Sequence, residues 1–131
     1  MTYEIELIHA QGIIMVRYFD FIHFDESRQV LEEILSASRE QGYRKILIYF
    51  KKYLFQMSVT DLYELGKAFA KSGLITVAYV CPENKIENRF LVTTARNCGA
   101  WIKYFELLED ACEWLKTTER HAFFHQEAYS N

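Results

Sequence analysis

Ser58 is the residue of this sequence whose position most strongly suggests regulation. It lies in the stretch FQMSVTDLYELGKAF, residues 55–69, where an apolar segment gives way to a helical pattern. As a helix N-cap, its hydroxyl would accept a backbone N–H of the first turn, with Asp61 three residues later as a capping-box partner. As a phosphorylation site, it would place a charge of about −2 at a helix N-terminus, where the helix dipole tolerates it. Thr60 is a second candidate for phosphorylation, and its alternative is a solvated residue of the first turn.

A second set of polar side chains follows two apolar segments of the chain. Parallel strands in an open α/β sheet end at one edge, and ligands bind outside that edge. Both segments lead into predicted helix N-termini, which attract anions. The alternative is a pair of ordinary solvated loops, because any such fold has polar residues at its strand ends. The candidate binding residues are Tyr53, Gln56, Cys81, Glu83, Asn84 and Lys85.

Cys81 and the C-terminal histidines could also do chemistry. A helix N-terminus after Cys81 would lower the pKa of its thiol, but a lone thiol with no assigned base is more typical of a small core residue. His121 and His125 are four residues apart, so a helix would place them on one face. Two ligands without an acidic third make a weak site, and the sequence predicts no metal and no cofactor. The alternative is a tail helix that packs Phe123 and Phe124 on a partner chain.

Catalytic motifs do not accompany these residues. The sequence contains no GxSxG, GxGxxG, Walker or HExxH pattern. We therefore expect a non-enzymatic protein. An enzyme that uses Cys81 or a loop carboxylate is the alternative that this argument leaves open.

The strands that must position these residues are visible in the spacing of apolar side chains. Residues 3–8 alternate apolar side chains with glutamate, and Gln11-Gly12 predicts a turn into a second, antiparallel strand over residues 13–19. Continuous apolar runs over residues 46–50 and 74–80 predict strands that are buried on both faces. Residues 101–105 predict a short last strand.

Four helices are predicted between and after these strands. Their expected limits are Asp25 as N-cap to Gly42, Ser58 to Gly73, Pro82 in the first turn to Gly99, and a last helix that ends near Thr117. Helical spacing predicts that Tyr63 and Phe90 face the core. The order of elements predicts an α/β fold with a four- to five-stranded mixed, mostly parallel sheet, an N-terminal hairpin and four helices.

Three phrases of the sequence resemble STAS domains, the fold of sulphate transporters and anti-sigma factor antagonists, and in particular the bacterial SpoIIAA-like group. They are GYRKILIYF, AYVCPENKIENRF and NCGAWIKYFELLEDACEWL, and the resemblance covers roughly residues 3 to 117. It implies a module that binds a partner kinase and is switched by phosphorylation of a serine after the central strand, which by position is Ser58. The group usually has an Asp-Ser-Ser/Thr-Gly motif there, whereas Met57 and Val59 flank Ser58 in this chain.

The bulk composition fits a single domain. The chain has 131 residues, of which 50% are hydrophobic and 16% aromatic, enough for a core without disulfides or metal. We expect one domain over residues 1–117 and a tail over 118–131. The net charge of −3 gives no general attraction to nucleic acid. Three widely spaced cysteines favour a reduced, cytoplasmic setting, and no apolar run approaches the length of about 18 residues that a membrane span needs.

The leading functional hypothesis is a STAS-like regulatory or interaction domain that forms a homodimer. Its partner would be a protein, such as a kinase or an anti-sigma-like regulator, or a small ligand. The alternative is a small apolar-ligand or lipid carrier, because the group is also likened to the CRAL-TRIO lipid-transfer fold and aromatic side chains can line a pocket. In a chain of 131 residues, however, a large cavity would remove much of the core.

Overall fold

The strands of the protein form one mixed sheet. The computed structural model describes residues 3–19, 23–50, 59–71, 75–82 and 86–118. Within them, five strands lie in the order β1-β2-β3-β4-β5, with β1 antiparallel to β2 and all other neighbours parallel. The strands are β1 (Tyr3–Ile8), β2 (Ile13–Tyr18), β3 (Lys45–Phe50), β4 (Thr76–Val80) and β5 (Trp101–Phe105). The predicted hairpin and the predicted parallel strands are confirmed.

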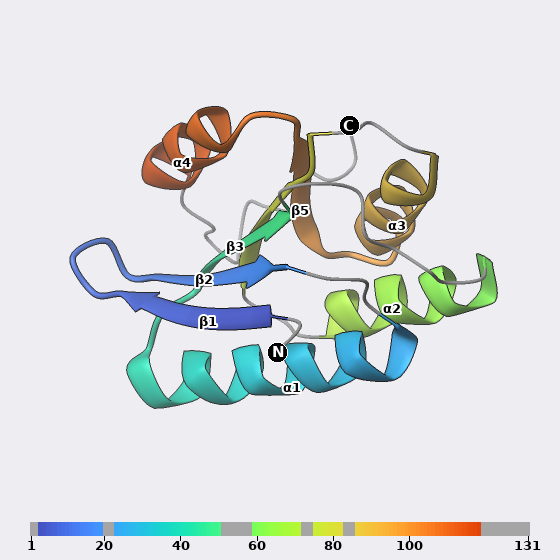
Figure 1. Ribbon diagram of the computed structural model, residues 1–131, viewed down its shortest axis with the longest axis horizontal. Coiled ribbons are helices and arrows are strands. Elements are labelled where there is room, and N and C mark those ends of the chain that lie inside the picture. The colour runs from blue at the N-terminus through green and yellow to red at the C-terminus, as the bar shows by residue number, and fades with distance from the viewer. Residues whose placement is uncertain (1–2, 20–22, 51–58, 72–74, 83–85, 119–131) are drawn as a thin grey trace.

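Four helices cover this sheet, three on one face and one on the other (Figure 1). They are α1 (Phe24–Gln41), α2 (Val59–Lys71), α3 (Ile86–Asn97) and α4 (Leu108–Thr117). Each of α1, α2 and α3 connects a strand to its parallel neighbour in sequential order. Because such crossovers are almost always right-handed, all three helices fall on the same face. The chain then crosses the sheet edge after β5 and lays α4 on the opposite face.

Two apolar cores follow from these layers. The larger core lies between the sheet and α1 to α3, and includes Leu31 of α1, Leu65 of α2 and Leu91 of α3. The smaller core lies between the sheet and α4, and its buried members are Ile13, Met15, Leu47, Ala78, Val80, Ala111 and Leu115. Every described residue of β4 is buried, which explains its continuous apolar sequence. No helix in the described ranges is long and apolar enough to cross a membrane.

A row of aromatic rings crosses the sheet within the larger core. Successive rings are Tyr3, Tyr18, Phe50, Tyr79 and Tyr104, one from each strand, with centroid separations of 6.2, 4.5, 5.4 and 6.3 Å. Tyr18 stacks on Phe50 at an interplanar angle of 7°. These two residues end β2 and β3, so large rings fill the core towards the carboxyl end of the parallel strands.

One helix start differs from the sequence-based expectation. The first helix begins at Phe24 with His23 as N-cap, so Asp25 lies inside the first turn, where its carboxylate still faces the positive end of the dipole. The third helix is described from Ile86, and residues 83–85 lie outside the described ranges, so its start near Pro82 stays a prediction. The N–H of Cys81 donates to the carbonyl of Phe105 at 3.0 Å, so the chain still follows the sheet at Cys81, and Pro82 lies in a bend beyond it.

The predicted helix ends agree better with the structure. Gly42 caps α1 with a φ of 75°, and its N–H donates to the carbonyl of Ser38 at 2.8 Å. Glycine adopts this left-handed conformation at little cost, which is why the position of Gly42 in the sequence predicted the end of the helix. The last helix ends at Thr117 as predicted.

Candidate functional site

The predicted binding edge exists as an arrangement of strands. Because β3 and β4 are parallel neighbours, their last residues, Phe50 and Val80, lie at the same edge, and α2 and α3 begin beyond it. Of the candidate residues, only Thr60 and Cys81 lie in the described part of the chain. Outside it are Ser58, Tyr53, Gln56, Glu83, Asn84 and Lys85, together with the tail residues His121, Phe123, Phe124 and His125. Their roles therefore stay predictions.

Thr60 is an exposed residue in the first turn of α2. The helix begins one residue earlier, at Val59, so Ser58 directly precedes it in the sequence. Asp61 also lies in this turn, close to the positive end of the helix dipole. The Thr60 side chain is accessible to a kinase while the helix stays folded. The same exposure fits the alternative interpretation of Thr60 as a solvated residue of the first turn.

Cys81 is buried in the larger core, with 1% of its surface exposed. Its backbone joins β4 to β5, because its carbonyl also accepts the hydroxyl of Tyr104 at 2.7 Å. A thiolate needs access to solvent or a charged partner to act as a nucleophile. This burial favours the interpretation of Cys81 as a small core residue over that of a reactive or ligand-contacting one.

Two aromatic residues that were expected in the core are instead exposed. Tyr63 of α2 has 45% of its surface exposed, and Phe90 of α3 has 37%, so the predicted inward orientation is wrong for both. Leu65 and Gly66 of α2 are buried, and Gly66 lies against Thr94 of α3. Leu65 could have revealed from the sequence that Tyr63 is exposed. An apolar stripe that includes Leu65 is shifted by one residue from the helical face that includes Tyr63.

Tyr63 and Phe90 lie at matching levels on neighbouring helices. Tyr63 is three residues before Gly66, and Phe90 is four residues before Thr94, so each is one turn from the helix contact. Since α2 and α3 both return antiparallel to the strands, both aromatics lie on the side of the contact nearer the carboxyl edge of the sheet. The Nζ of Lys67 lies 5.3 Å from the centroid of the Tyr63 ring. Exposed aromatics with a neighbouring cation are typical of protein interfaces.

Tyr18 is a described titratable group at this edge of the sheet. Tyr18 ends β2, and burial raises the pKa of its phenol, so it stays neutral at physiological pH and cannot act as a base. Among the residues that the structure describes, no three His, Cys, Asp or Glu side chains are grouped as metal ligands.

The interior cavity is small. It has a volume of about 20 Å³ and lies between the sheet and α1 to α3, lined by Tyr18, Ser27, Val30, Leu31, Ile34, Ile48, Phe50, Leu65, Tyr79 and Leu91. This volume accommodates about one water molecule, whereas ligand pockets have volumes of about 300–1,000 Å³. A hollow of about 640 Å³ on the surface is lined by α4 alone. Neither of these two spaces is an enclosed cavity of that size.

The fold is the feature that this chain shares with known proteins. No model of a protein family matches the chain, and no curated protein matches it. The solved structure of the anti-sigma factor antagonist SpoIIAA in its unphosphorylated form matches with a TM-score of 0.59 and 14% sequence identity, over 90% of this chain and 99% of SpoIIAA. The phosphorylated form of SpoIIAA, a Bacillus cell fate determinant, matches with a TM-score of 0.51 and 15% identity, over 85% and 96% of the two chains.

A third solved structure supports the same assignment. The NMR structure of the protein TM1081 matches with a TM-score of 0.54 and 14% identity, over 90% of each chain. The STAS-like fold that the sequence phrases resemble is confirmed. The chain therefore has the α/β fold of SpoIIAA, with a five-stranded mixed sheet and four helices.

Proposed function

We propose that this chain is a regulatory interaction domain that acts by binding a protein partner and not by catalysis. The observation that carries the proposal is the fold, which matches an anti-sigma factor antagonist over 90% of this chain and 99% of that one. Fold alone does not fix function, so an interaction domain must also offer a surface that its partner can bind. The pair Tyr63 and Phe90 supplies a candidate.

The proposed partner surface lies on the outer side of α2 and α3, near the carboxyl edge of the sheet. Tyr63 and Phe90 offer exposed aromatic area on two helices that are held together by the Gly66–Thr94 contact. Rigid aromatic side chains contribute most of the binding energy in many interfaces, because they bury a large area with little loss of entropy. Tyr53 and Gln56, which lie between β3 and α2 in the sequence, would extend this surface, as would residues 83–85, between β4 and α3.

Phosphorylation is the regulation that we propose for this surface. Ser58 immediately precedes α2, and Thr60 lies within its first turn. A phosphate here would add two negative charges near Tyr63, which is three residues beyond Thr60, and would change what partner the surface accepts. We assign the switch to Ser58 because its sequence position matches the serine of the resembling group. A plain N-cap role is the alternative.

The remaining parts of the proposal concern the extent and setting of the domain. The last described helix ends at Thr117, which supports a domain over residues 1–117 followed by a tail over 118–131. We place the domain in the cytoplasm as a homodimer. The carrier alternative gains no support from the cavity of about 20 Å³, which would have to enlarge greatly to hold a lipid.

Mass spectrometry of the protein purified from its own cells tests this function. Native spectra report bound partners and ligands, and peptide mapping reports phosphate on residues 55–69. We expect a protein partner, and phosphate on Ser58 that disappears in Ser58→Ala but persists in the matched Thr60→Ala variant. A lipid-sized ligand with no protein partner would contradict the proposal and support the carrier. A bound protein partner together with an unmodified Ser58 would support the interaction domain and contradict the phosphorylation switch.

A further inference from the structure

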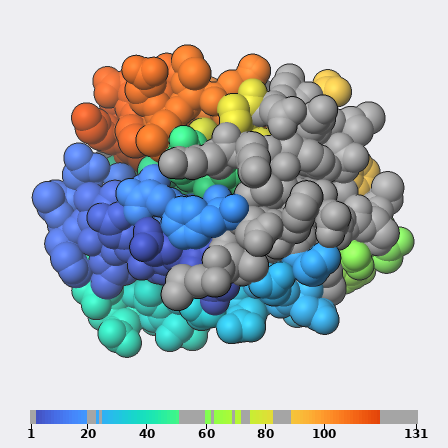
Figure 2. Space-filling view, viewed as in Figure 1, coloured from blue at the N-terminus to red at the C-terminus, as the bar shows by residue number. Residues whose placement is uncertain are grey.

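Within the described residues, strand β1 lies at an edge of the sheet. Its neighbour is β2, and the two pair without a bulge from Tyr3 opposite Tyr18 to Ile8 opposite Ile13. In Figure 2 the blue atoms of β1 and β2 lie at the surface, between α4 in orange and α1 below them. β1 contains no proline, and in the described part of the chain its only backbone hydrogen bond outside this pairing joins the Ile8 carbonyl to Gln11. In the described part of the chain, alternate N–H and C=O groups of β1 therefore point away from β2, where they could pair with another strand.

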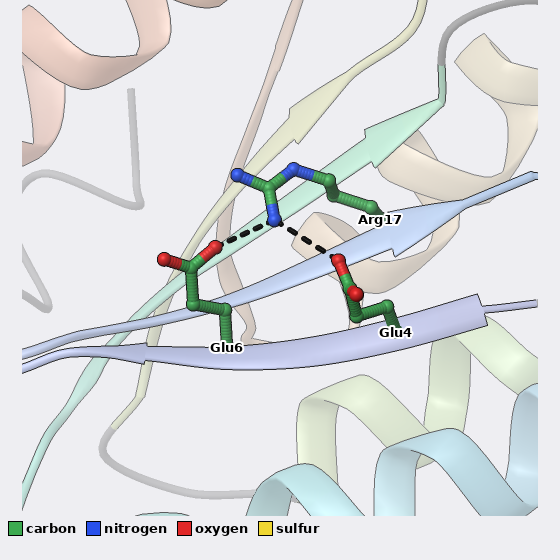
Figure 3. A network of polar contacts seen from close by, with 3 residues as sticks. All are labelled: Glu4, Glu6 and Arg17. Carbon is green, nitrogen blue, oxygen red and sulfur yellow. Dashed lines mark hydrogen bonds and ion pairs between the residues drawn. The ribbon is translucent and has the colours of Figure 1, made fainter.

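Carboxylates line this edge on the face that α4 shares. Glu4 and Glu6 project from β1 towards one guanidinium nitrogen, Nη1 of Arg17, at 3.3 and 2.6 Å (Figure 3). Their side chains are 53% and 49% exposed, whereas that of Arg17 is 32% exposed. A single guanidinium thus holds two carboxylates from the inner side of the strand. The group has a net charge of −1, and the outer side of both carboxylates faces solvent.

Carboxylates also lie beneath the edge, on the face that α1 covers. The hydroxyl of Tyr3 donates to Glu33, which also accepts a hydrogen bond of 3.3 Å from Gln29. Glu33 and Glu26 both raise the pKa of Tyr3, which reaches about 12, so both carboxylates lie within electrostatic range of this end of β1. Negative charge therefore flanks the open backbone groups on both faces of the sheet.

We propose that the β1 edge is a docking site for an extended segment of a partner protein that carries basic side chains at alternate positions. The segment would add as a sixth strand, with main-chain hydrogen bonds to β1. Side chains alternate between faces along a strand, so every second residue of the segment would lie beside Glu4 and Glu6. Lysine or arginine there would bind these carboxylates from outside while Arg17 binds them from inside.

A second copy of this chain is a poor occupant of the same edge. An antiparallel β1–β1 pairing centred on Ile5 sets Glu4 of one copy opposite Glu6 of the other, and like charges directly opposite each other are destabilising. A parallel pairing also brings the two carboxylate rows together. The homodimer that the sequence predicts would therefore use another surface. The edge is also separate from Tyr63 and Phe90, which lie on helices packed beside β3 to β5, so this site goes beyond the proposed function.

Binding of short synthetic peptides to the isotopically labelled full chain tests the proposal by NMR. The probe is a capped peptide of alternating Lys and Val, with a Glu-Val peptide of the same pattern as the first control. The second control is the Lys-Val peptide with N-methyl groups on alternate residues, which keeps every charge but cannot pair with an edge. We expect amide shifts concentrated in residues 3–8 for the Lys-Val peptide, weaker binding at higher salt, and no binding of either control.

Matched variants of the protein separate a specific site from general attraction. Glu4→Gln with Glu6→Gln is expected to weaken Lys-Val binding by about five- to tenfold, because two charge pairs are lost. The control variant, Glu109→Gln with Glu113→Gln, changes two exposed residues of α4 and removes the same charge. It is expected to change the affinity for the Lys-Val peptide by less than about twofold. Equal losses in the two variants, or equal binding of the N-methylated peptide, would overturn the proposal. So would the absence of binding to the unmodified chain. Retention of peptide binding in Tyr63→Ala would separate this site from the proposed partner surface.

Discussion

Gly66 of α2 lies so close to Thr94 of α3 that a side chain at position 66 has no space. A Cβ atom there would lie 2.9 Å from Cγ2 of Thr94, 3.1 Å from its Cβ and 3.2 Å from the backbone nitrogen of Ala95. Carbon atoms make favourable contact at about 3.5–4.0 Å, so one of the two helices would have to move. This close approach fixes how α2 and α3 pack against each other, one turn away from Tyr63 and from Phe90.

Replacing Gly66 with alanine should therefore destabilise the protein, although alanine is the better helix former. The gain in helix propensity is about 1 kcal/mol, and overpacking costs about 1–3 kcal/mol, so we expect a net loss of up to about 2 kcal/mol in the free energy of unfolding. Urea denaturation measures it. Thr94→Ser removes Cγ2 and should recover at least about half of the loss in the double variant. Independent, additive effects of the two substitutions would show that the helices do not meet here.

The proposed partner surface makes a separate prediction for Tyr63 and Phe90. Each alanine variant should weaken binding of the partner that co-purifies with the wild-type protein by at least about tenfold, because buried aromatics contribute a large share of interface energy. Isothermal titration measures the affinity. Leu107→Ala, which truncates a residue that is 54% exposed beside α4, is the matched control and should bind normally. Equal binding by all three variants would place the partner elsewhere.

The three cysteines should differ in their reaction with a thiol reagent. Cys98 is exposed, Cys112 is partly buried and Cys81 is buried, so labelling should follow that order in the native protein. Peptide mapping after timed labelling measures the three rates, and labelling in urea supplies the reference in which all three react. Rapid native labelling of Cys81 would contradict its place in the core and revive its candidacy as a reactive site.

The contact between Tyr3 and Glu33 predicts a loss of stability at high pH. The hydrogen bond to Glu33, with burial and the charges of Glu33 and Glu26, raises the pKa of Tyr3 from 10.0 to about 12. When folding raises the pKa of a phenol, the protonated phenol contributes its full stabilisation at pH values below the pKa of the unfolded state. That contribution is lost as the pH rises from about 10 through about 12.

Comparison with Tyr3→Phe isolates this effect from other groups that titrate at high pH. The wild type should be the more stable protein at pH 9, and the difference between the two free energies of unfolding should shrink towards pH 12. Tyr18→Phe is a useful second variant, because burial and not a hydrogen bond dominates the rise in the pKa of Tyr18. A difference between wild type and Tyr3→Phe that stays constant from pH 9 to 12 would exclude the contact with Glu33.

The parts of the fold that could be predicted from sequence are those with a local physical cause. Alternation along residues 3–8, the turn at Gly12 and the apolar runs of β3 and β4 each report which faces of a strand are buried. Gly42 marks a helix end because its φ of 75° strains other residues. Such features predicted the order of the elements along the chain and the number of helices.

The remaining features depend on contacts between elements. Helical spacing alone placed Tyr63 and Phe90 inward, whereas the contact of Gly66 with Thr94 joins two helices at residues 28 positions apart in sequence. The hydrogen bond from Cys81 to Phe105, which keeps the chain on the sheet just before Pro82, also joins residues far apart in sequence. The carboxylate row at the β1 edge also needs the hairpin register that sets Glu4 opposite Arg17. Most candidate site residues lie outside the described ranges, so their roles await the experiments above.

The order of the strands has a consequence for the protein during its synthesis. Because the sheet order β1 to β5 is also the chain order, a chain emerging from the ribosome can add each strand to an edge that already exists. The face that includes Leu47, Ala78 and Val80 receives its helix, α4, after all five strands have been made. A nascent chain that ends before Leu108 would thus expose this apolar face to other chains. The solubility of such a chain would depend on a helix of ten residues that is made only after all five strands.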